Sequence, residues 1–118
     1  MLAQVTAAAL ASENQHLAHP VAIDSRPTSA NQEDHVSMAT YAARRLLEMT
    51  DNAAHIVAVE LLAAAQGIEL RRPLESSAAI EKAHVQIRQH SAFVQADRPL
   101  AGDIQRVAAW VLQGGMPT

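Results

Sequence analysis

The sequence has no cysteine and very few aromatic residues, with one Phe, one Tyr and one Trp among 118 residues. The lack of cysteine excludes disulfide bonds and thiol chemistry and agrees with a reducing, cytoplasmic location. Because aromatic residues make up only 3% of a chain that is 49% hydrophobic, any core must be built from Ala, Leu, Val and Ile. Ala is the best helix former, so the composition predicts an all-α fold of closely packed helices.

Basic clusters and long apolar segments are also missing. The net charge is −3, and no basic run exceeds the pairs Arg44-Arg45 and Arg71-Arg72, so nucleic acid and anionic membranes are not expected as partners. The most apolar window, residues 53–65, carries Glu60 and is shorter than the roughly 20 residues that span a bilayer. No Lys or Arg precedes the apolar stretch from Leu2 to Ala11, which argues against a secretory signal.

The hydrophobic periodicity predicts that residues 1–118 form a single helical unit, without a second domain. Four helices are expected, at Leu2 to Leu17, at about Val36 to Gln66, from the cap Ser76 or Ser77 to about His90, and from Asp103 to the pair Gly114-Gly115. Pro20 should end the first, and an extended connector should follow to Pro27. The helix at Leu2 begins abruptly, which suggests that Met1 lies inside an element that starts earlier.

The second predicted helix is unusually long, since neither Gly nor Pro interrupts it before Gly67, which is placed to end it. About thirty residues would form a rod of about 45 Å. Its start is open between a capping box from Ser29 to Gln32 and a cap at Asp34 with Ser37. The expected core-facing series is Leu46, Met49, Ala53, Ile56 or Val57, Leu61 and Ala64.

After Ala53 this helix is apolar on nearly every side, so other helices must surround it. Three shorter helices could not cover that surface, which implies identical chains, missing sequence or both as partners. Within the apolar run, Glu60 is expected to be a partnered core carboxylate. His55 is expected to be structural and to contact Asp51 four residues earlier.

The most polar segment runs from Thr28 to Met38, directly before the long helix. One or two polar side chains can cap a helix start, where free N–H groups and the helix dipole favour oxygen atoms. Here the polar residues are almost uninterrupted, namely Asn31, Gln32, Glu33, Asp34, His35 and Ser37. This excess over what capping requires indicates a functional site.

Several stretches resemble the C-terminal portion of histidine ammonia-lyase, of the aromatic amino acid lyase family. They are Gln4 to Asn14, Ala18-His19-Pro20, Asp24-Ser25, Pro27 to Met38 and Glu60 to Gly67. The resemblance covers nearly the whole chain in register. It implies a piece of the long-helix bundle of the ammonia-lyase, fumarase/aspartase-like fold, found in a cytoplasmic homotetramer. The present chain is similar only to the last part of those much longer chains, which would explain its uncovered apolar helix.

The resemblance implies a function in histidine catabolism, the non-oxidative deamination of L-histidine to trans-urocanate and ammonia. Members of the family use an electrophile, 4-methylideneimidazol-5-one (MIO), formed from their own Ala-Ser-Gly tripeptide, and a tyrosine on an N-terminal loop. Neither is found in this sequence. Ala11-Ser12 is followed by Glu13, and Tyr41 falls inside a helical pattern. The 118 residues alone are therefore expected to carry no cofactor and to be inactive.

By the same resemblance, Glu33 is the catalytic residue of this chain and lines the substrate pocket. A carboxylate can accept a hydrogen bond from an imidazole N–H or an ammonium group. Gln32 and His35 would hold the loop around it, whereas Asn31 and Asp34 would act as caps. One departure is Ala39, where the family usually has Gly, and the added methyl group could disturb the site.

Other interpretations remain open at this point. A non-enzymatic helical relic, or an assembly module that pairs with longer lyase chains, would keep the fold and lose the chemistry. Ammonia-lyases for other aromatic amino acids are similar here but usually place Gln at the position of Glu33, which favours histidine. A metal site of His16, His19, Glu33 and His35 has suitable ligands, but the spacing matches no zinc motif and the resemblance implies no metal.

Overall fold

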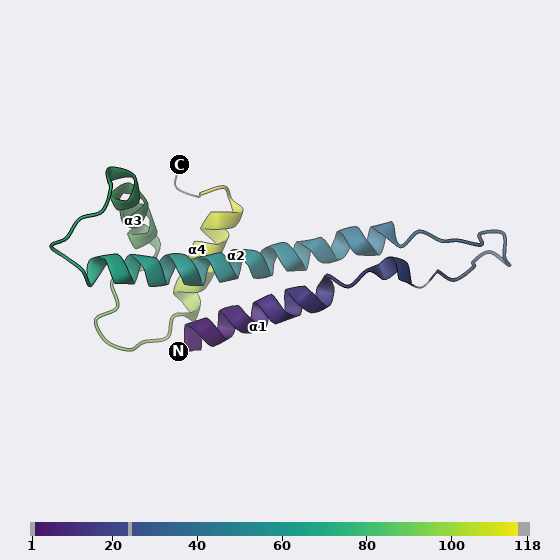
Figure 1. The fold of residues 1–118 in the computed structure, drawn as a ribbon, viewed down its shortest axis with the longest axis horizontal. Coiled ribbons are helices and arrows are strands. Elements are labelled where there is room, and N and C mark those ends of the chain that lie inside the picture. The colour runs from purple at the N-terminus through teal and green to yellow at the C-terminus, as the bar shows by residue number, and fades with distance from the viewer. Residues whose placement is uncertain (1, 24, 116–118) are drawn as a thin grey trace.

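The structure, a computed structural model, describes residues 2–23 and 25–115, and over these residues it is all-helical, as predicted (Figure 1). Its elements are α1 (Leu2–Leu17), the short 3-10 helix η1 (Val21–Ile23), α2 (Ala39–Glu69), α3 (Ala78–His90) and α4 (Ala101–Leu112). Two residues on which predictions were made lie outside the described residues. They are Met1, which was expected to lie inside an element that starts earlier, and Asp24, which belongs to the expected connector.

The prediction for α1 is confirmed at both ends. The helix is rich in Ala, and its last turn is followed by Pro20, which disfavours helical geometry at the residue before it. The connector was predicted to be extended, and this is wrong at Val21–Ile23, which form a single 3-10 turn. Such short turns are common as connectors after helix ends.

The predicted bounds of α2 are shifted toward the C-terminus, since the helix runs from Ala39 to Glu69. Gly67 does not end it, which corrects the prediction. A glycine weakens a helix interior but leaves the N–H and carbonyl ladder intact, and the Leu70 N–H still donates to the Gln66 carbonyl at 3.1 Å. The helix stops only shortly before Pro73, which has no N–H to donate.

The termini of α3 and α4 follow local sequence signals. The Ser77 hydroxyl accepts the Ile80 N–H at 3.4 Å and caps α3, so Ser77 is the cap among the two predicted candidates, Ser76 and Ser77. Helix α4 begins at Ala101, slightly before the predicted Asp103, and ends at Leu112, and Gly114 follows with φ 80°. The Gly115 N–H donates to the Trp110 carbonyl at 2.9 Å, which is the Schellman pattern at a helix C-terminus.

Helix α2 is the axis of the molecule, and the other helices pack on it (Figure 1). Helix α1 lies beside its first half, where the Asn52 side-chain amide donates to Glu13 Oε2 at 2.9 Å and to Asn14 Oδ1 at 3.1 Å. Asn14 in turn donates to the Met49 carbonyl at 3.0 Å. Because Asn52 is buried, these bonds satisfy a polar group that would otherwise be costly in the α1–α2 contact.

The core lies where α4 and α3 meet the second half of α2. Its buried members are Ala54, Ala58, Leu62, Ala65, Ile87, Val107 and Ala108. The predicted core-facing series on α2 is wrong at Leu46, which is 55% exposed, and at Ala53 and Ala64, which are exposed too, whereas Leu61 packs against the core as predicted. After Ala53 this helix is apolar on nearly every side, so periodicity could not select the face. The observed face presents small Ala side chains, which allow close approach of the neighbouring helices.

The molecule is elongated, measuring 71 × 29 × 20 Å. Its radius of gyration is 20.0 Å, whereas a compact chain of this length would have about 13 Å. Many large apolar side chains are exposed, including Leu2, Ile23, Leu47, Leu70 and Leu74. The sequence-based expectation of uncovered apolar surface is thus confirmed, and the described part of α1 has no buried residue at all.

Candidate functional site

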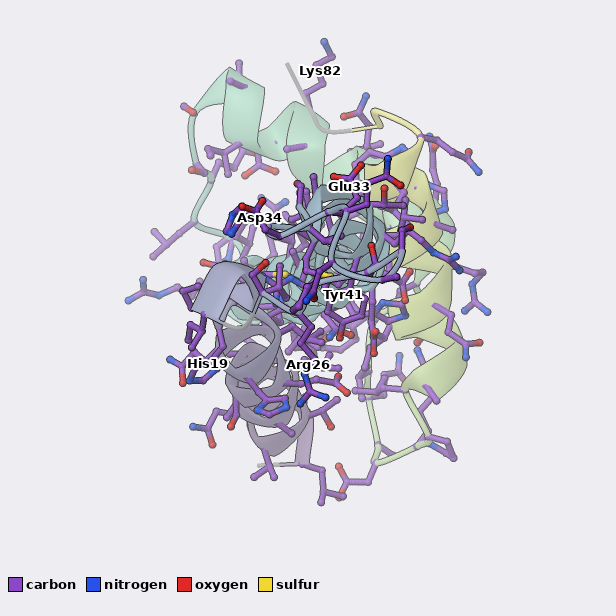
Figure 2. All side chains as sticks on the ribbon, turned by 90° about the vertical axis from the view of Figure 1, so that its right-hand side faces the viewer. His19, Arg26, Glu33, Asp34, Tyr41 and Lys82 are labelled. Atoms are coloured by element: carbon purple, nitrogen blue, oxygen red, sulfur yellow. The ribbon has the colours of Figure 1, made fainter. Side chains whose placement is uncertain are left out.

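The polar segment predicted as a site forms a loop that projects beyond the N-terminal end of α2, at the right of Figure 1. All residues from Arg26 to His35 are exposed. Figure 2 looks onto this end of the molecule and shows Glu33 and Asp34 on different sides of the loop. The loop therefore presents its side chains away from the helical body.

A backbone pair closes the tip of the loop. The Thr28 N–H donates to the Glu33 carbonyl at 3.0 Å, and the Glu33 N–H donates back to the Thr28 carbonyl at 3.3 Å. The Gln32 N–H also donates to the Ser29 carbonyl at 3.2 Å. Glu33 is thus held at the end of a small closed ring of backbone rather than in a free strand.

Three consecutive residues inside this ring have left-handed backbone. The φ angles are 54° at Ser29, 55° at Ala30 and 68° at Asn31. Left-handed geometry costs non-glycine residues on the order of 1 kcal/mol each, and Asn tolerates it best. The predicted capping box from Ser29 is therefore wrong, because these residues form a turn ahead of the helix. Such strain persists only where the surroundings impose it, and it is concentrated at functional sites.

A second, wider closure joins the two ends of the loop. The Val36 N–H donates to the Ser25 hydroxyl at 3.0 Å, and both residues are partly buried. Ser25 and His35 line a groove of about 240 Å³ at the base of the loop, together with Ala39. Ser37 accepts the Ala39 N–H at 3.3 Å, whereas Met38, the residue before α2, makes no side-chain cap.

The predicted site residues lie together on this loop, and all three are exposed. Glu33 and Gln32 are at the tip and His35 is at the base. The expectation that Asn31 and Asp34 cap the helix is wrong, because α2 begins after them at Ala39, and of the polar side chains in the described loop only the Ser37 hydroxyl accepts an N–H of its first turn. Tyr41 lies on α2, as predicted, and is 59% exposed, with the Arg45 guanidinium 5.9 Å from its ring.

The histidines considered for a metal site at the end of α1 and the residues predicted for structural roles on α2 lie away from the tip of the loop. His19 Nδ1 lies 2.8 Å from the His16 carbonyl at the end of α1. Within residues 2–23 and 25–115, no group of three or more His, Cys, Asp or Glu side chains is arranged to hold a metal. His55 contacts Asp51, as predicted, with Nδ1 2.9 Å from the Asp51 carbonyl. Glu60 is exposed, so the prediction of a core carboxylate is wrong for this chain.

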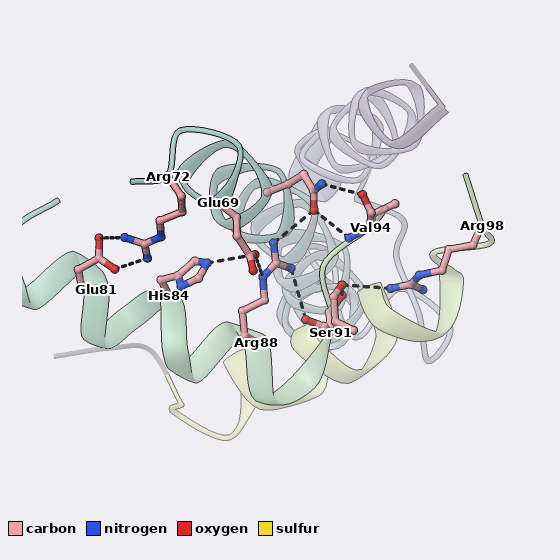
Figure 3. Close-up of polar contacts among 10 residues, drawn as sticks. Glu69, Arg72, Glu81, His84, Arg88, Ser91, Val94 and Arg98 are labelled. Carbon is pink, nitrogen blue, oxygen red and sulfur yellow. Dashed lines mark hydrogen bonds and ion pairs between the residues drawn. The ribbon is translucent and has the colours of Figure 1, made fainter. Parts of the chain in front are cut away.

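The opposite end of the rod contains a polar network that sequence reasoning missed (Figure 3). Arg88 Nε donates to Glu69 Oε2 at 2.6 Å, and His84 Nε2 lies 3.4 Å from the same oxygen. Nearby, the Arg72 guanidinium and the Ser76 N–H bind the Glu81 carboxylate, and they lower the pKa of Glu81 to about 2. These bonds join the end of α2 to α3.

The side chain of Gln66 links α2 to the segment before α4. Its Nε2 donates to the Val94 carbonyl at 2.9 Å, and its Oε1 accepts the Val94 N–H at 3.1 Å. Arg88 Nη2 lies 3.3 Å from the same Oε1. The Gln66 side-chain amide thus binds both the N–H and the carbonyl of Val94, as the backbone of a neighbouring β-strand would. Sequence spacing gave no signal for it, because Gln66 and Val94 are distant in sequence.

Asp103 is the most enclosed charge described here. Burial removes water from its carboxylate, which alone would raise the pKa, but hydrogen bonds from Arg98 and Ser91 and the nearby guanidinium groups hold the pKa below its usual range. The Ser91 hydroxyl donates to Oδ2 at 3.0 Å, and Arg106 pairs with Oδ1. Every oxygen has a partner, so the cluster serves the α3–α4 connection rather than an open site.

Comparison with known proteins decides the family. The family model described as aromatic amino acid lyase matches residues 1–89, which is most of the chain. The chain belongs to the aromatic amino acid lyase family. The match includes α1, the loop with Glu33, α2 and nearly all of α3.

The individual relatives of this lyase chain agree. The chain is 64% identical over 114 residues to histidine ammonia-lyase of Desulfotalea psychrophila, covering 97% of this chain and 22% of the relative. It is 62% identical over 106 residues to histidine ammonia-lyase of Photobacterium profundum, covering 90% and 21%. The chain spans about a fifth of the length of these relatives.

A solved structure confirms the ammonia-lyase fold. The crystal structure of histidine ammonia-lyase from Trypanosoma cruzi matches this lyase chain with a TM-score of 0.91 and 43% identity, over 98% of this chain and 23% of that one. None of the helices described here is long and apolar enough to cross a membrane. The exposed faces of α1 and α2 thus belong to a chain that matches only part of a larger fold.

Proposed function

We propose that these residues form the C-terminal part of a histidine ammonia-lyase, which converts L-histidine to trans-urocanate and ammonia, and that Glu33 contacts the substrate. The relatives named above, at 64% and 62% identity, support the reaction. The main structural support is the closed, strained ring that presents Glu33 at an exposed tip, because such strain is not needed merely to start a helix.

The chemistry assigned to Glu33 is that of a hydrogen-bond acceptor. Its carboxylate can accept from the imidazole N–H or the ammonium group of L-histidine, and charge-assisted bonds of this kind are about twice as strong as neutral ones. The gain is larger where water is excluded. Because Glu33 is exposed in this chain, another part of the full protein must cover the loop to form such a pocket.

The electrophile of the family does not fit any residues of this chain. No Ala-Ser-Gly tripeptide occurs in the sequence. The nearest approach, Ala11-Ser12, lies in the interior of α1 and is followed by Glu13, whose carboxylate accepts a hydrogen bond from Asn52. The MIO group and the tyrosine loop would have to come from elsewhere in the protein. We infer that the 118 residues alone are inactive, and that the working form is a cytoplasmic homotetramer or a complex with the upstream part of a lyase.

A chimera tests the reaction. The matching C-terminal 114 residues of the Desulfotalea psychrophila enzyme are replaced by this chain, and product formation from L-histidine, L-phenylalanine and L-tyrosine is measured. Urocanate from L-histidine alone is expected. Turnover of the other two amino acids would point to a different aromatic substrate. A well-assembled chimera without any turnover would indicate an inactive assembly module.

The role of Glu33 is tested in the same chimera. Glu33→Ala should lower kcat/KM by at least about a hundredfold, as expected for loss of a positioned carboxylate. Glu75→Ala is the matched control, since Glu75 is an exposed glutamate in the connection at the other end of α2. Equal activity of Glu33→Ala and the unmodified chimera would remove Glu33 from the site.

A further inference from the structure

We propose that Ser25 is a positioning residue, whose hydroxyl fixes the direction in which the loop with Glu33 leaves the helical body. The proposal rests on the proposed function of Glu33 and adds a residue to it. Ser25 does not touch substrate. It acts by accepting the Val36 N–H at 3.0 Å across the base of the loop.

Two closures of the loop have separate effects. The inner one, between Thr28 and Glu33, fixes the shape of the ring at the tip. It leaves the ring free to swing as a unit, because both of its partners move together. The outer one joins Ser25, just after η1, to Val36, which leads directly into α2. The outer bond, between the Val36 N–H and the Ser25 hydroxyl, therefore fixes the orientation of the ring relative to α2.

Little else in the described loop can replace that bond. Residues 26–35 are all exposed, so the loop gains almost no stability from buried apolar contacts. Ser25 and Val36, by contrast, are partly buried and line the groove at the base together with Val21 and Ala42. The hydroxyl therefore lies where the exposed and the packed parts of the chain meet. Losing it would leave the Val36 N–H without this partner and would widen the range of Glu33 positions.

The test uses the full-length chimera and four variants: Ser25→Ala, Ser25→Thr, Ser77→Ala and the double variant Ser25→Ala/Glu33→Ala. Ser77→Ala is the matched control, because Ser77 is also a serine whose hydroxyl accepts a backbone N–H, at the other end of the rod. Two quantities are measured, namely hydrogen exchange of the peptide that contains the Val36 amide, and kcat with KM for L-histidine.

We expect Ser25→Ala to exchange the Val36 amide about fivefold faster, which corresponds to loss of one hydrogen bond. Its kcat should fall about tenfold with a smaller change in KM, since small misplacements of a catalytic group are costly. Ser25→Thr keeps the hydroxyl and should restore both quantities, and Ser77→Ala should leave both unchanged. In the double variant, kcat should equal that of Glu33→Ala alone, because Ser25 acts through Glu33.

Unchanged exchange in Ser25→Ala would overturn the proposal, as would faster exchange with unchanged kcat. An equally large further loss of kcat on top of Glu33→Ala would show that Ser25 acts independently of Glu33 and would also overturn it. If the unmodified chimera makes no urocanate, the proposed function fails by itself. The exchange measurement then still decides whether the Ser25 hydroxyl holds the loop.

Discussion

Asp103 shows how one buried carboxylate can organise a helix connection. Its side chain is only 5% exposed and is bound by Ser91, Arg98 and Arg106. Replacing it with Asn removes the negative charge and leaves two guanidinium groups facing a neutral amide. Asp103→Asn should lower the free energy of unfolding by about 2 kcal/mol. Urea denaturation of the chain measures this, and Asp97→Asn, at an exposed position of the same connection, should change it by less than about 0.5 kcal/mol.

Glu81 makes a prediction for pH dependence. The hydrogen bond from Arg72, followed by that from the Ser76 N–H, lowers the pKa of Glu81 from 4.5 to about 2. A carboxyl group with a depressed pKa stabilises the fold above its unfolded-state value, and the contribution is lost as pH falls from about 4.5 toward 2. Glu81→Gln should therefore flatten the fall of the thermal midpoint in this range.

Thermal unfolding followed between pH 7 and pH 2 measures the effect. Since the pair is exposed to solvent, the difference should shrink in high salt. Glu75→Gln removes an exposed carboxylate from the connection before α3 and is the control. A wild-type curve that coincides with that of Glu81→Gln at every pH would contradict the assigned interaction.

Gly67 and Gly114 should respond in opposite ways to substitution by Ala. Gly67 lies inside α2, and a Cβ added there would meet no atom within 4 Å, so Gly67→Ala should stabilise the chain by about 0.5–1 kcal/mol. Gly114 has φ 80° in the Schellman motif after α4, so Gly114→Ala should destabilise it by about 1 kcal/mol. Denaturation midpoints of the two variants decide this. If both substitutions changed the free energy of unfolding in the same direction, either the helical backbone of Gly67 or the left-handed backbone of Gly114 would be wrong.

These elements also show what local sequence signals can predict. The bounds of helix α1 were predicted to the residue and the start of α3 to one of two neighbouring serines, because Pro20 and the Ser77 hydroxyl act through neighbouring backbone. The ends of α2 were missed by about one turn at most, since Gly67 is only a weak helix breaker. Its buried face could not be predicted, because its second half is apolar on nearly every side and such a segment takes its orientation from its neighbours.

The candidate site was located by sequence but its geometry was not. Clustered polar residues and the family resemblance both pointed to the segment around Glu33. The left-handed backbone from Ser29 to Asn31 was missed because none of these residues is glycine and because Ser29 and Ala30 have no preference for it, which leaves Asn31 as the single local signal. The bond from Val36 to Ser25 likewise joins residues across the loop, which a pattern of neighbours cannot reveal. Whether Glu33 binds substrate stays a prediction.

At the scale of the whole molecule, the elongated shape leaves much of the apolar surface uncovered. The rod is 71 Å long, its core is confined to one half, and α1 has no buried residue in the described part of the chain. The chain spans about a fifth of its relatives. A fold of this kind gains little stability from its own core, so most of the burial of α1 and α2 should come from contacts with the rest of a lyase.

Binding of a separately produced upstream part tests this view. The upstream part of the Desulfotalea psychrophila enzyme should bind the chain and raise its thermal midpoint, because a ligand that binds only the folded state stabilises it. Leu47 is 76% exposed on α2, so Leu47→Glu should leave the stability of the isolated chain within about 0.5 kcal/mol of wild type. It should weaken binding at least about tenfold, since a buried charge at an apolar contact is costly. Sedimentation of the mixtures measures the affinity, with Glu75→Lys as control, and equal affinity of Leu47→Glu and wild type would show that this face of α2 stays exposed in the complex.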